Sequence, residues 1–314
     1  MTAARAPRDL TRFAWLSIAA AVATITLKTY AWLVTGSVGL LSDAAESVVN
    51  LVAAFVALIA LRIAARPADD NHHFGHAKAE YFSAAIEGVM IFIAAAAILF
   101  TAVERFLHPM PLENVGIGLA VSVVASVING GVAFVLLRAG RTHRSLTLTA
   151  DGKHLMTDVW TSVGVVVGVI LVSLTGWQQL DPLIAFGVGV NIIVTGWKLI
   201  SESSAGLMDV ALPEEDHEVI VGVLQKFSRE DEVLFHGLRT RQAGHERFVR
   251  VDMLVPGAWS VRRGHDLIED LEAALRAELP DLDMVVHLEP LEDPRAYADH
   301  PVEVPIHPLP SPSE

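Results

Sequence analysis

The sequence has no cysteine, little charge overall and no basic excess. The absence of cysteine in 314 residues excludes disulfides, thiolate zinc sites, iron–sulfur clusters and cysteine nucleophiles. Charged residues make up 19% of the chain, against about 25% in average soluble proteins. Hydrophobic residues make up 52%, and the mean hydropathy is +0.45. The net charge of −13 has the wrong sign for a nucleic-acid-binding protein. An ordinary soluble protein and a nucleic-acid partner are therefore both excluded.

The charge is unevenly distributed along the chain. Residues 209–314 contain 23 acidic and 10 basic side chains, so this part alone carries the net charge of −13. Residues 1–208 are electrically neutral and contain the long apolar stretches. The sequence therefore predicts an apolar first part and an acidic, water-soluble second part.

Six stretches in the first part have the length and composition of membrane spans. A transmembrane helix needs about 20 mostly apolar residues. The first stretch is too long for the apolar region of a signal peptide, and no small-residue cleavage site follows it. We therefore expect a six-helix transmembrane domain over residues 1–208, with spans at about 13–34, 38–63, 80–107, 115–137, 146–174 and 182–204.

The distribution of lysine and arginine predicts the orientation of these spans. Basic residues concentrate before the first span and in the links after the second and fourth spans, whereas the alternate links contain only Arg105. Short cytoplasmic loops carry an excess of lysine and arginine. Both termini are therefore expected in the cytoplasm.

The second part has the pattern of a soluble α+β domain over residues 209–290. Helices are expected at 214–227 and 261–279, and strands at 233–242, 246–255 and 284–288, which gives an αββαβ order. The last 25 residues contain seven prolines, so residues 291–314 are expected to form a disordered tail.

Ionisable side chains recur inside two of the predicted spans. Groups of this kind at bilayer depth cost several kcal/mol unless they are paired, so they are functional candidates. Both sets have the spacing i, i+3, i+7, which places each set on one face of its helix. The second span contributes Asp43, Glu46 and Asn50, and the fifth contributes Asp151, His154 and Asp158.

Antiparallel packing of these two spans would place their stripes opposite each other. One imidazole and three oxygen-bearing side chains then form a plausible four-ligand site for Zn²⁺ or a similar ion, from Glu46, Asn50, His154 and Asp158. Asp43 on the outer side and Asp151 on the cytoplasmic side are candidates for a flanking relay of ions or protons. The alternative is that these groups only join helices through hydrogen bonds.

A second cluster of metal-binding residue types lies in the link after the second span. Residues 69–76 read Asp-Asp-Asn-His-His-Phe-Gly-His. Carboxylate and imidazole donors in so short a loop could hold a divalent ion. A polar turn between two helices remains the alternative.

Three motifs together resemble the cation diffusion facilitator family of metal transporters, and the similarity extends to about residue 290. The motifs are Gly-Ser-Val-Gly-Leu-Leu-Ser-Asp in the second span, Pro-Ala-Asp-Asp-Asn-His-His-Phe-Gly-His-Ala-Lys-Ala-Glu after it, and Asp-Gly-Lys-His-Leu-Met-Thr-Asp-Val in the fifth span. The Leu-Met-Asp-Val-Ala-Leu-Pro hinge and the Leu-Arg-Thr-Arg-Gln-Ala-Gly hairpin resemble bacterial zinc and iron efflux members in particular. The resemblance implies a homodimer in the bacterial inner membrane, with a metallochaperone-like cytoplasmic domain, that exports divalent metal in exchange for protons.

The resemblance also assigns residues to sites. It implies a transport site at Glu46, Asn50, His154 and Asp158, a loop site at Asp69, His72 and His76, regulatory sites at His236, Asp252, His265, His287 and Glu289, and an inter-subunit charge interlock of Lys78 with Asp209. The chain departs from the family pattern at Glu46, Asn50, Asp252 and Glu289. Replacing a carboxylate by the Asn50 amide would admit Fe²⁺, Mn²⁺, Co²⁺ or Cd²⁺ beside Zn²⁺.

The sequence thus favours a metal/proton antiporter over two alternatives. A membrane metal sensor or scaffold that moves no ions would need only the soluble sites, and the midspan stripes favour transport over it. An intramembrane metalloprotease would need His-Glu-x-x-His on a helix, which the sequence lacks. We therefore expect a secondary transporter and no enzyme.

Overall fold

The computed structural model describes residues 9–35, 38–108, 115–177, 179–231 and 233–297. The chain divides into two compact units, residues 1–207 and 208–314, which are described separately.

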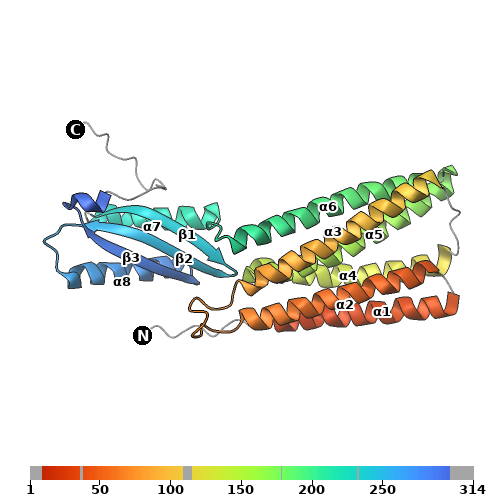
Figure 1. Ribbon diagram of the computed structural model, residues 1–314, viewed down its shortest axis with the longest axis horizontal. Coiled ribbons are helices and arrows are strands. Elements are labelled where there is room, and N and C mark those ends of the chain that lie inside the picture. The colour runs from red at the N-terminus through yellow and green to blue at the C-terminus, as the bar shows by residue number, and fades with distance from the viewer. Residues whose placement is uncertain (1–8, 36–37, 109–114, 178, 232, 298–314) are drawn as a thin grey trace. The chain divides into compact units, whose positions relative to one another are not determined.

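Six long helices make up the first unit (Figure 1). Each has 25 to 30 residues, which at about 1.5 Å per residue exceeds the roughly 30 Å of bilayer hydrocarbon. Among the described residues, five of the six helices contain a stretch long and apolar enough to cross a membrane. The sixth, α5, carries four ionisable residues in its first half: Asp151, Lys153, His154 and Asp158. The helices are α1 (Thr11–Thr35), α2 (Val38–Ala64), α3 (Ala79–Leu107), α4 (Val115–His143), α5 (Leu146–Thr175) and α6 (Leu180–Leu207).

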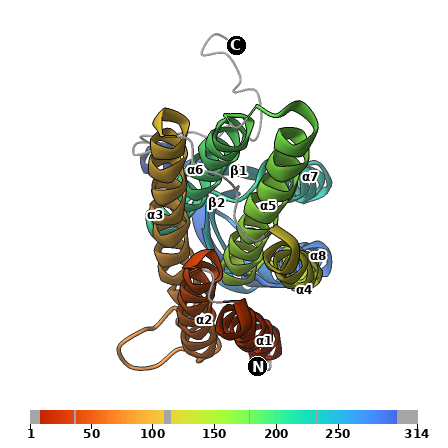
Figure 2. The same cartoon turned by 90° about the vertical axis from the view of Figure 1, so that its right-hand side faces the viewer.

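The six helices share two apolar cores, and α5 contributes to both. One core joins α1, α2, α4 and α5 through residues such as Ile18, Leu58 and Leu136. The other joins α3 and α6 to α5, through Ile91 and Leu199 among others. Figure 2, an end-on view, shows α1, α2 and α4 on one side of the bundle, with α3 and α6 beside each other. Because it belongs to both groups, α5 is positioned from several directions.

Small residues allow close helix contacts in this bundle. A Cβ atom at Gly196 of α6 would lie 3.1 Å from the carbonyl oxygen of Gly88 of α3. A Cβ atom at Gly152 of α5 would lie 2.9 Å from Leu137 Cγ of α4. Such close approach is typical of helix pairs in membranes, where van der Waals packing drives association. The pairs α3–α6 and α4–α5 are therefore tightly held.

The second unit has the αββαβ order expected from the sequence. Its elements are α7 (Glu214–Asp231), β1 (Leu234–Ala243), β2 (Glu246–Val255), α8 (Val261–Glu278) and β3 (Leu282–Pro290), followed by a short 3₁₀ helix, η1 (Pro294–Tyr297). The sheet has the order β1-β2-β3, antiparallel between β1 and β2 and parallel between β2 and β3. The predicted fold class, a helical membrane protein with an α+β domain, is confirmed.

One face of the sheet packs against both helices. Val249, Val251 and Met253 of β2 lie in a core with Leu224 of α7 and Leu271 of α8. Side chains alternate between the two faces of a strand, so the residues between them lie on the opposite face. Opposite these core residues, the register pairs His236 with Asp252, and Asp252 with His287. Three polar side chains thus form a row across the sheet.

The ordered part of the domain extends beyond the expected boundary at residue 290. The Leu291 N–H donates to the Val255 carbonyl oxygen at 2.8 Å, and the Tyr297 hydroxyl donates to the Leu291 carbonyl oxygen at 3.0 Å. Ala296 is buried. Residues 291–297 are therefore part of the domain, and the rest of the expected tail, 298–314, lies outside the described residues.

Candidate metal centres

Asn50 of α2, together with His154 and Asp158 of α5, forms a polar cluster within the bundle. His154 Nε2 lies 2.8 Å from Asn50 Oδ1, and Asn50 Nδ2 donates a short hydrogen bond to Asp158 Oδ2. Asn50 and His154 are each 4% exposed. An amide oxygen only accepts, so the hydrogen of this His154–Asn50 bond belongs to Nε2. Asn50 therefore contacts two of the other predicted transport ligands, His154 and Asp158.

A residue that sequence reasoning missed, Asn129 of α4, completes this cluster. Its Nδ2 donates to Asp158 Oδ2 at 3.2 Å, and its side chain is 3% exposed. Asn129 Oδ1 and His154 Nδ1 are buried and have no hydrogen-bond partner among the described residues. The only sequence signal for it was an asparagine inside the apolar fourth span. We name the Asn50, Asn129, His154 and Asp158 side chains the midspan cluster.

The remaining stripe residues are Asp43, Glu46 and Asp151. The side chains of Glu46 and Asp43 lie outside the described part of the structure. Asp151 is buried, and its Oδ1 accepts a hydrogen bond from Ser17 Oγ of α1 at 3.1 Å. Asp151 Oδ2 has no partner among the described residues. The proposed cytoplasmic relay residue is thus linked to α1.

Two further buried carboxylates lie on α3. Glu87 is 0% exposed, and its Oε1 accepts from Ser83 Oγ at 3.3 Å. Glu80 Oε2 accepts from the Thr147 backbone N–H at 3.2 Å and from the Ser145 hydroxyl. Glu80 therefore caps the N-terminus of α5, the helix that carries His154.

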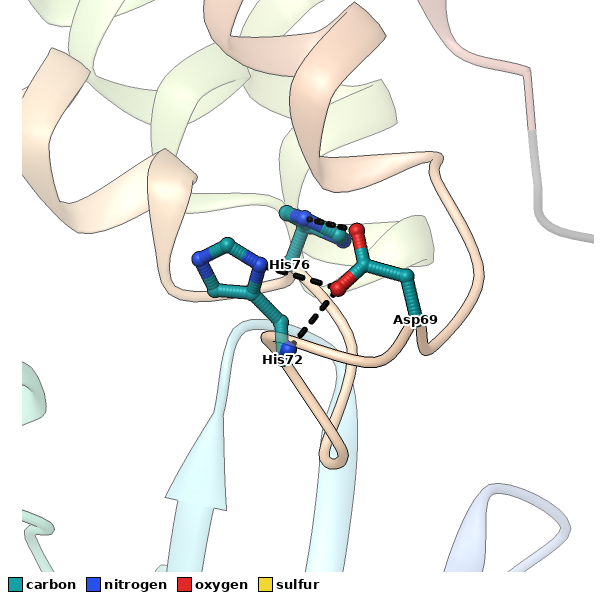
Figure 3. A group of neighbouring side chains, drawn as sticks. All are labelled: Asp69, His72 and His76. Atoms are coloured by element: carbon teal, nitrogen blue, oxygen red, sulfur yellow. Dashed lines mark hydrogen bonds and ion pairs between the residues drawn. The ribbon is translucent and has the colours of Figure 1, made fainter.

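The predicted loop cluster comes together in the structure (Figure 3). Asp69 Oδ1 lies 3.1 Å from His72 Nδ1, and Asp69 Oδ2 lies 3.4 Å from His76 Nε2. One ligand atom from each of the three residues lies within 4.8 Å of the others. Imidazole nitrogens and a carboxylate at this spacing suit a zinc-like ion.

Local hydrogen bonds orient the loop ligands. The backbone N–H groups of Asn71 and His72, together with the His72 ring, keep the pKa of Asp69 below its usual value. His76 Nδ1 lies 3.2 Å from the Pro67 carbonyl oxygen, which leaves Nε2 directed at Asp69. His73 Nε2 instead faces the Asp70 carbonyl oxygen at 3.1 Å. The third histidine of the loop, His73, is therefore not part of this cluster.

The polar row on the open face of the sheet forms a third cluster. His236 Nε2 lies 3.1 Å from Glu289 Oε2, and His287 Nδ1 lies 3.2 Å from Glu289 Oε1. Asp252 Oδ1 is 3.7 Å from His287 Nδ1 and is buried without a hydrogen-bond partner in the described part of the chain. Two imidazoles and two carboxylates provide a donor set that fits a divalent ion.

Other predicted residues lie apart from these clusters. His265 is an exposed residue of α8, and its Nε2 lies 3.9 Å from Glu269 Oε1. In the described residues it makes no hydrogen bond or ion pair with the sheet cluster. Lys78 Nζ donates to the Leu207 carbonyl oxygen at 3.4 Å, and Asp209 accepts from Arg241 Nη1 at 3.0 Å. The Lys78–Asp209 interlock links two separately described units and remains a prediction.

Comparison with known proteins identifies the family and supports the fold class. The cation efflux transmembrane domain matches residues 14–208, and the cytoplasmic domain of cation efflux proteins matches residues 212–291. The uncharacterized transporter sll1263 of Synechocystis sp. is 52% identical over 293 residues, 93% of this chain and 94% of its own. The cation-efflux pump FieF of Shigella flexneri is 29% identical over 283 residues, 90% of this chain and 93% of its own.

Part of the chain also matches solved structures. A structure of CzrB in its zinc form is 37% identical over 26% of this chain and 90% of its own, with a TM-score of 0.24. The two domain matches cover most of the sequence in the expected order. The chain therefore belongs to the cation efflux family, also called cation diffusion facilitators, whose members are multi-pass membrane metal transporters and not enzymes.

Proposed function

We propose that the protein exports a divalent transition metal, Zn²⁺ first, from the cytoplasm across the bacterial inner membrane in exchange for protons. The single observation that carries this proposal is the midspan cluster, in which His154 and Asp158 of α5 meet Asn50 of α2 inside the bundle. A sensor that binds ions without moving them would need no buried donors between these two helices. Transport across the bilayer does need them.

The mixed nitrogen and oxygen donors of this site suit more than one transition-metal dication. His154 supplies one nitrogen, whereas Asn50 and Asp158 supply oxygens, and we propose Glu46 as the fourth ligand. Nitrogen favours Zn²⁺, while amide and carboxylate oxygens also suit Mn²⁺, Fe²⁺, Co²⁺ and Cd²⁺. We therefore expect Zn²⁺ transport with weaker discrimination than a site with a second carboxylate at position 50 would give.

Exchange with protons follows from competition for the same atoms. A metal ion needs a neutral imidazole and ionised carboxylates, so its binding releases protons and its departure is promoted by them. In the proposed cycle, metal enters from the cytoplasm past Asp151, and the bundle then exposes the site to the periplasm. Asp43 would lie on that outer route. Protons entering from the periplasm then replace the metal at His154 and Asp158.

For alternating access, we propose that the bundle divides into a moving group of four helices and a fixed pair. The core that joins α1, α2, α4 and α5 holds the midspan cluster, whereas α3 and α6 pack closely together. We propose that the first group rocks and that α3 and α6 form the contact between two subunits of a homodimer. The termini are then cytoplasmic, as the distribution of lysine and arginine predicts.

The two remaining clusters have regulatory roles in this proposal. Metal at Asp69, His72 and His76 would supply or sense cytoplasmic metal. Metal at the sheet cluster would neutralise part of the acidic domain surface and draw two cytoplasmic domains together, with His265 contributed across the dimer. Lys78 and Asp209 would act as the pivot that passes this movement to the helices.

Flux through purified protein in liposomes tests the proposal. Zn²⁺ and Mn²⁺ uptake would be measured with an imposed pH gradient, for the wild type, Asp158→Asn and Asn50→Asp. We expect Asp158→Asn to abolish flux and Asn50→Asp to raise the preference for Zn²⁺ over Mn²⁺. An unchanged rate in Asp158→Asn would refute the site. Binding of metal without any flux in the wild type would favour the sensor alternative.

A further inference from the structure

Asn129 belongs to the midspan cluster but lies on α4, whereas the two predicted stripes lie on α2 and α5. Its amide donates to the Asp158 oxygen that also accepts from Asn50. The two asparagines therefore approach one carboxylate oxygen, Asn50 from α2 and Asn129 from α4. The Asn129 side chain is almost entirely buried.

The atoms left over at this cluster are acceptors. One Asn50 amide hydrogen is directed at Asp158, and the hydrogen on His154 Nε2 is directed at Asn50. Asn129 Oδ1 and His154 Nδ1 each have a lone pair and no donor among the described residues. Buried polar atoms in proteins nearly always have a partner, and exceptions call for a ligand or water. A bound cation would satisfy acceptors of this kind.

The packing of α4 on α5 fixes Asn129 relative to Asp158. Gly130, the next residue, faces Val159, since a Cβ atom there would lie 3.6 Å from Val159 Cγ2. Two turns further along α4, Leu137 packs so close to Gly152 that a Cβ atom there would lie only 2.9 Å from Leu137 Cγ. Asn129 therefore stays with Asp158 and His154 on one tight helix pair, whereas Asn50 belongs to α2.

Charge balance favours a neutral ligand at this position. In the proposed site, the carboxylates of Glu46 and Asp158 already neutralise a dication. A further ligand should then add an oxygen without adding charge, and a carboxamide does this. Amide and carboxylate oxygens favour harder ions, such as Mn²⁺, more than they favour Zn²⁺.

We infer that Asn129 is a ligand of the transported ion, supplying its side-chain oxygen to the site formed by Asn50, His154 and Asp158. This inference rests on the proposed function, since it concerns the same site. The Asn129 oxygen widens the range of accepted metals towards oxygen-preferring dications.

The test compares Asn129→Leu, which keeps the size and removes both polar atoms, with Ser126→Ala. Ser126 lies one turn away on α4, and its hydroxyl donates to the Ser122 carbonyl oxygen of its own helix at 2.7 Å. Initial flux rates would give the KM for Mn²⁺ and Zn²⁺ in liposomes containing the full chain. Loss of one oxygen ligand should raise the KM for Mn²⁺ about tenfold and that for Zn²⁺ about threefold or less, with both unchanged in Ser126→Ala.

A second variant keeps the inference falsifiable if Asn129→Leu does not fold. Asn129→Asp retains an oxygen but adds a charge, so it should lower the KM for Mn²⁺ and slow its release, which lowers kcat. An equal rise in KM for both metals in Asn129→Leu would show that Asn129 only positions Asp158, and would overturn the inference. So would values in Asn129→Leu or Asn129→Asp that match Ser126→Ala.

A binding measurement separates this inference from the proposal of transport. Calorimetry with Mn²⁺ and Zn²⁺ would use the full chain carrying Asp69→Ala and Asp252→Ala, which weaken the loop and sheet clusters. Selective loss of Mn²⁺ binding in Asn129→Leu supports the inference even if the wild type moves no ions. Conversely, wild-type flux with no Asn129 effect on binding overturns the inference and leaves the transport proposal standing.

Discussion

Glu80 Oε2 of α3 accepts a hydrogen bond of 3.2 Å from the backbone N–H of Thr147, in the first turn of α5. The first N–H groups of a helix have no partner within the helix, and a carboxylate there also interacts favourably with the helix dipole. This contact holds α3 to the helix that carries His154 and Asp158. The position of the midspan cluster therefore depends on a residue distant from it in sequence.

Removing this contact should destabilise the bundle. In Glu80→Ala, the Ser145 hydroxyl and the Thr147 N–H lose a buried acceptor, which costs on the order of 1–3 kcal/mol. We expect a lower Tm in detergent and a lower maximal flux. Glu104→Ala is the matched control, because Glu104 lies on the same helix and is exposed. Equal Tm values for the two variants would contradict this role of Glu80.

Metal binding at the loop cluster should weaken as the pH falls. A metal ion binds only the neutral imidazoles of His72 and His76, so protons compete with the metal and its affinity should fall as the pH is lowered. Asp69 should add little to this dependence, since hydrogen bonds from Asn71 and His72 keep its pKa below the usual value. Calorimetry at pH 7.5 and 5.5 would measure this. His73→Ala should follow the wild-type profile, and a pH-independent affinity would contradict the assignment.

Substitution in the sheet cluster should abolish the metal-dependent approach of two cytoplasmic domains. Asp252→Ala removes the buried carboxylate opposite His287, so the row loses its central donor. Distances between spin labels in the full-length protein, with and without Zn²⁺, would record the change. The expected result is shortening in the wild type and in the control His217→Ala, but none in Asp252→Ala. Shortening in all three would exclude Asp252 as a ligand.

The cytoplasmic domain should depend strongly on the buried Arg247–Asp216 pair. Arg247 Nε and Nη2 donate to the two Asp216 oxygens at 2.9 and 3.1 Å. Asp216→Ala leaves an unpaired buried guanidinium and should reduce the free energy of unfolding by about 3–5 kcal/mol.

A more exposed pair provides the comparison for this prediction. Arg276 and Glu272 form an i, i+4 pair on α8, and Glu272→Ala should cost only about 0.3–0.5 kcal/mol. Urea denaturation followed by the fluorescence of Trp259 would compare the variants. Similar costs for Asp216→Ala and Glu272→Ala would contradict the argument.

The sequence predicted the helices and strands well because their signals are local. Long apolar runs marked α1 to α6, and alternating side chains marked β1 and β2, with most ends within three residues of those observed; α4 continues six residues further, to His143. The loop cluster was also predictable, since Asp69, His72 and His76 lie within eight residues. The last strand was longer than expected, because Leu282 and Pro290 pair with β2 at its two ends.

The contacts between distant segments were harder to predict. The i, i+3, i+7 spacing placed Asn50 on one stripe, and His154 with Asp158 on another. It did not predict the hydrogen bonds between the two stripes. Asn129 gave no periodic signal, and Glu80 gave none that distinguished it from an interfacial charge.

The sequence by itself determined the division into an apolar and an acidic part, the six helices, the αββαβ order and the cluster of the loop. Only the tertiary structure decided that Asn129 meets Asp158, that Glu80 caps α5, and that His236, Asp252 and His287 form one row. The physical reason is that hydropathy and periodicity act along one element, whereas strand register and helix packing are fixed by cores that many distant residues share.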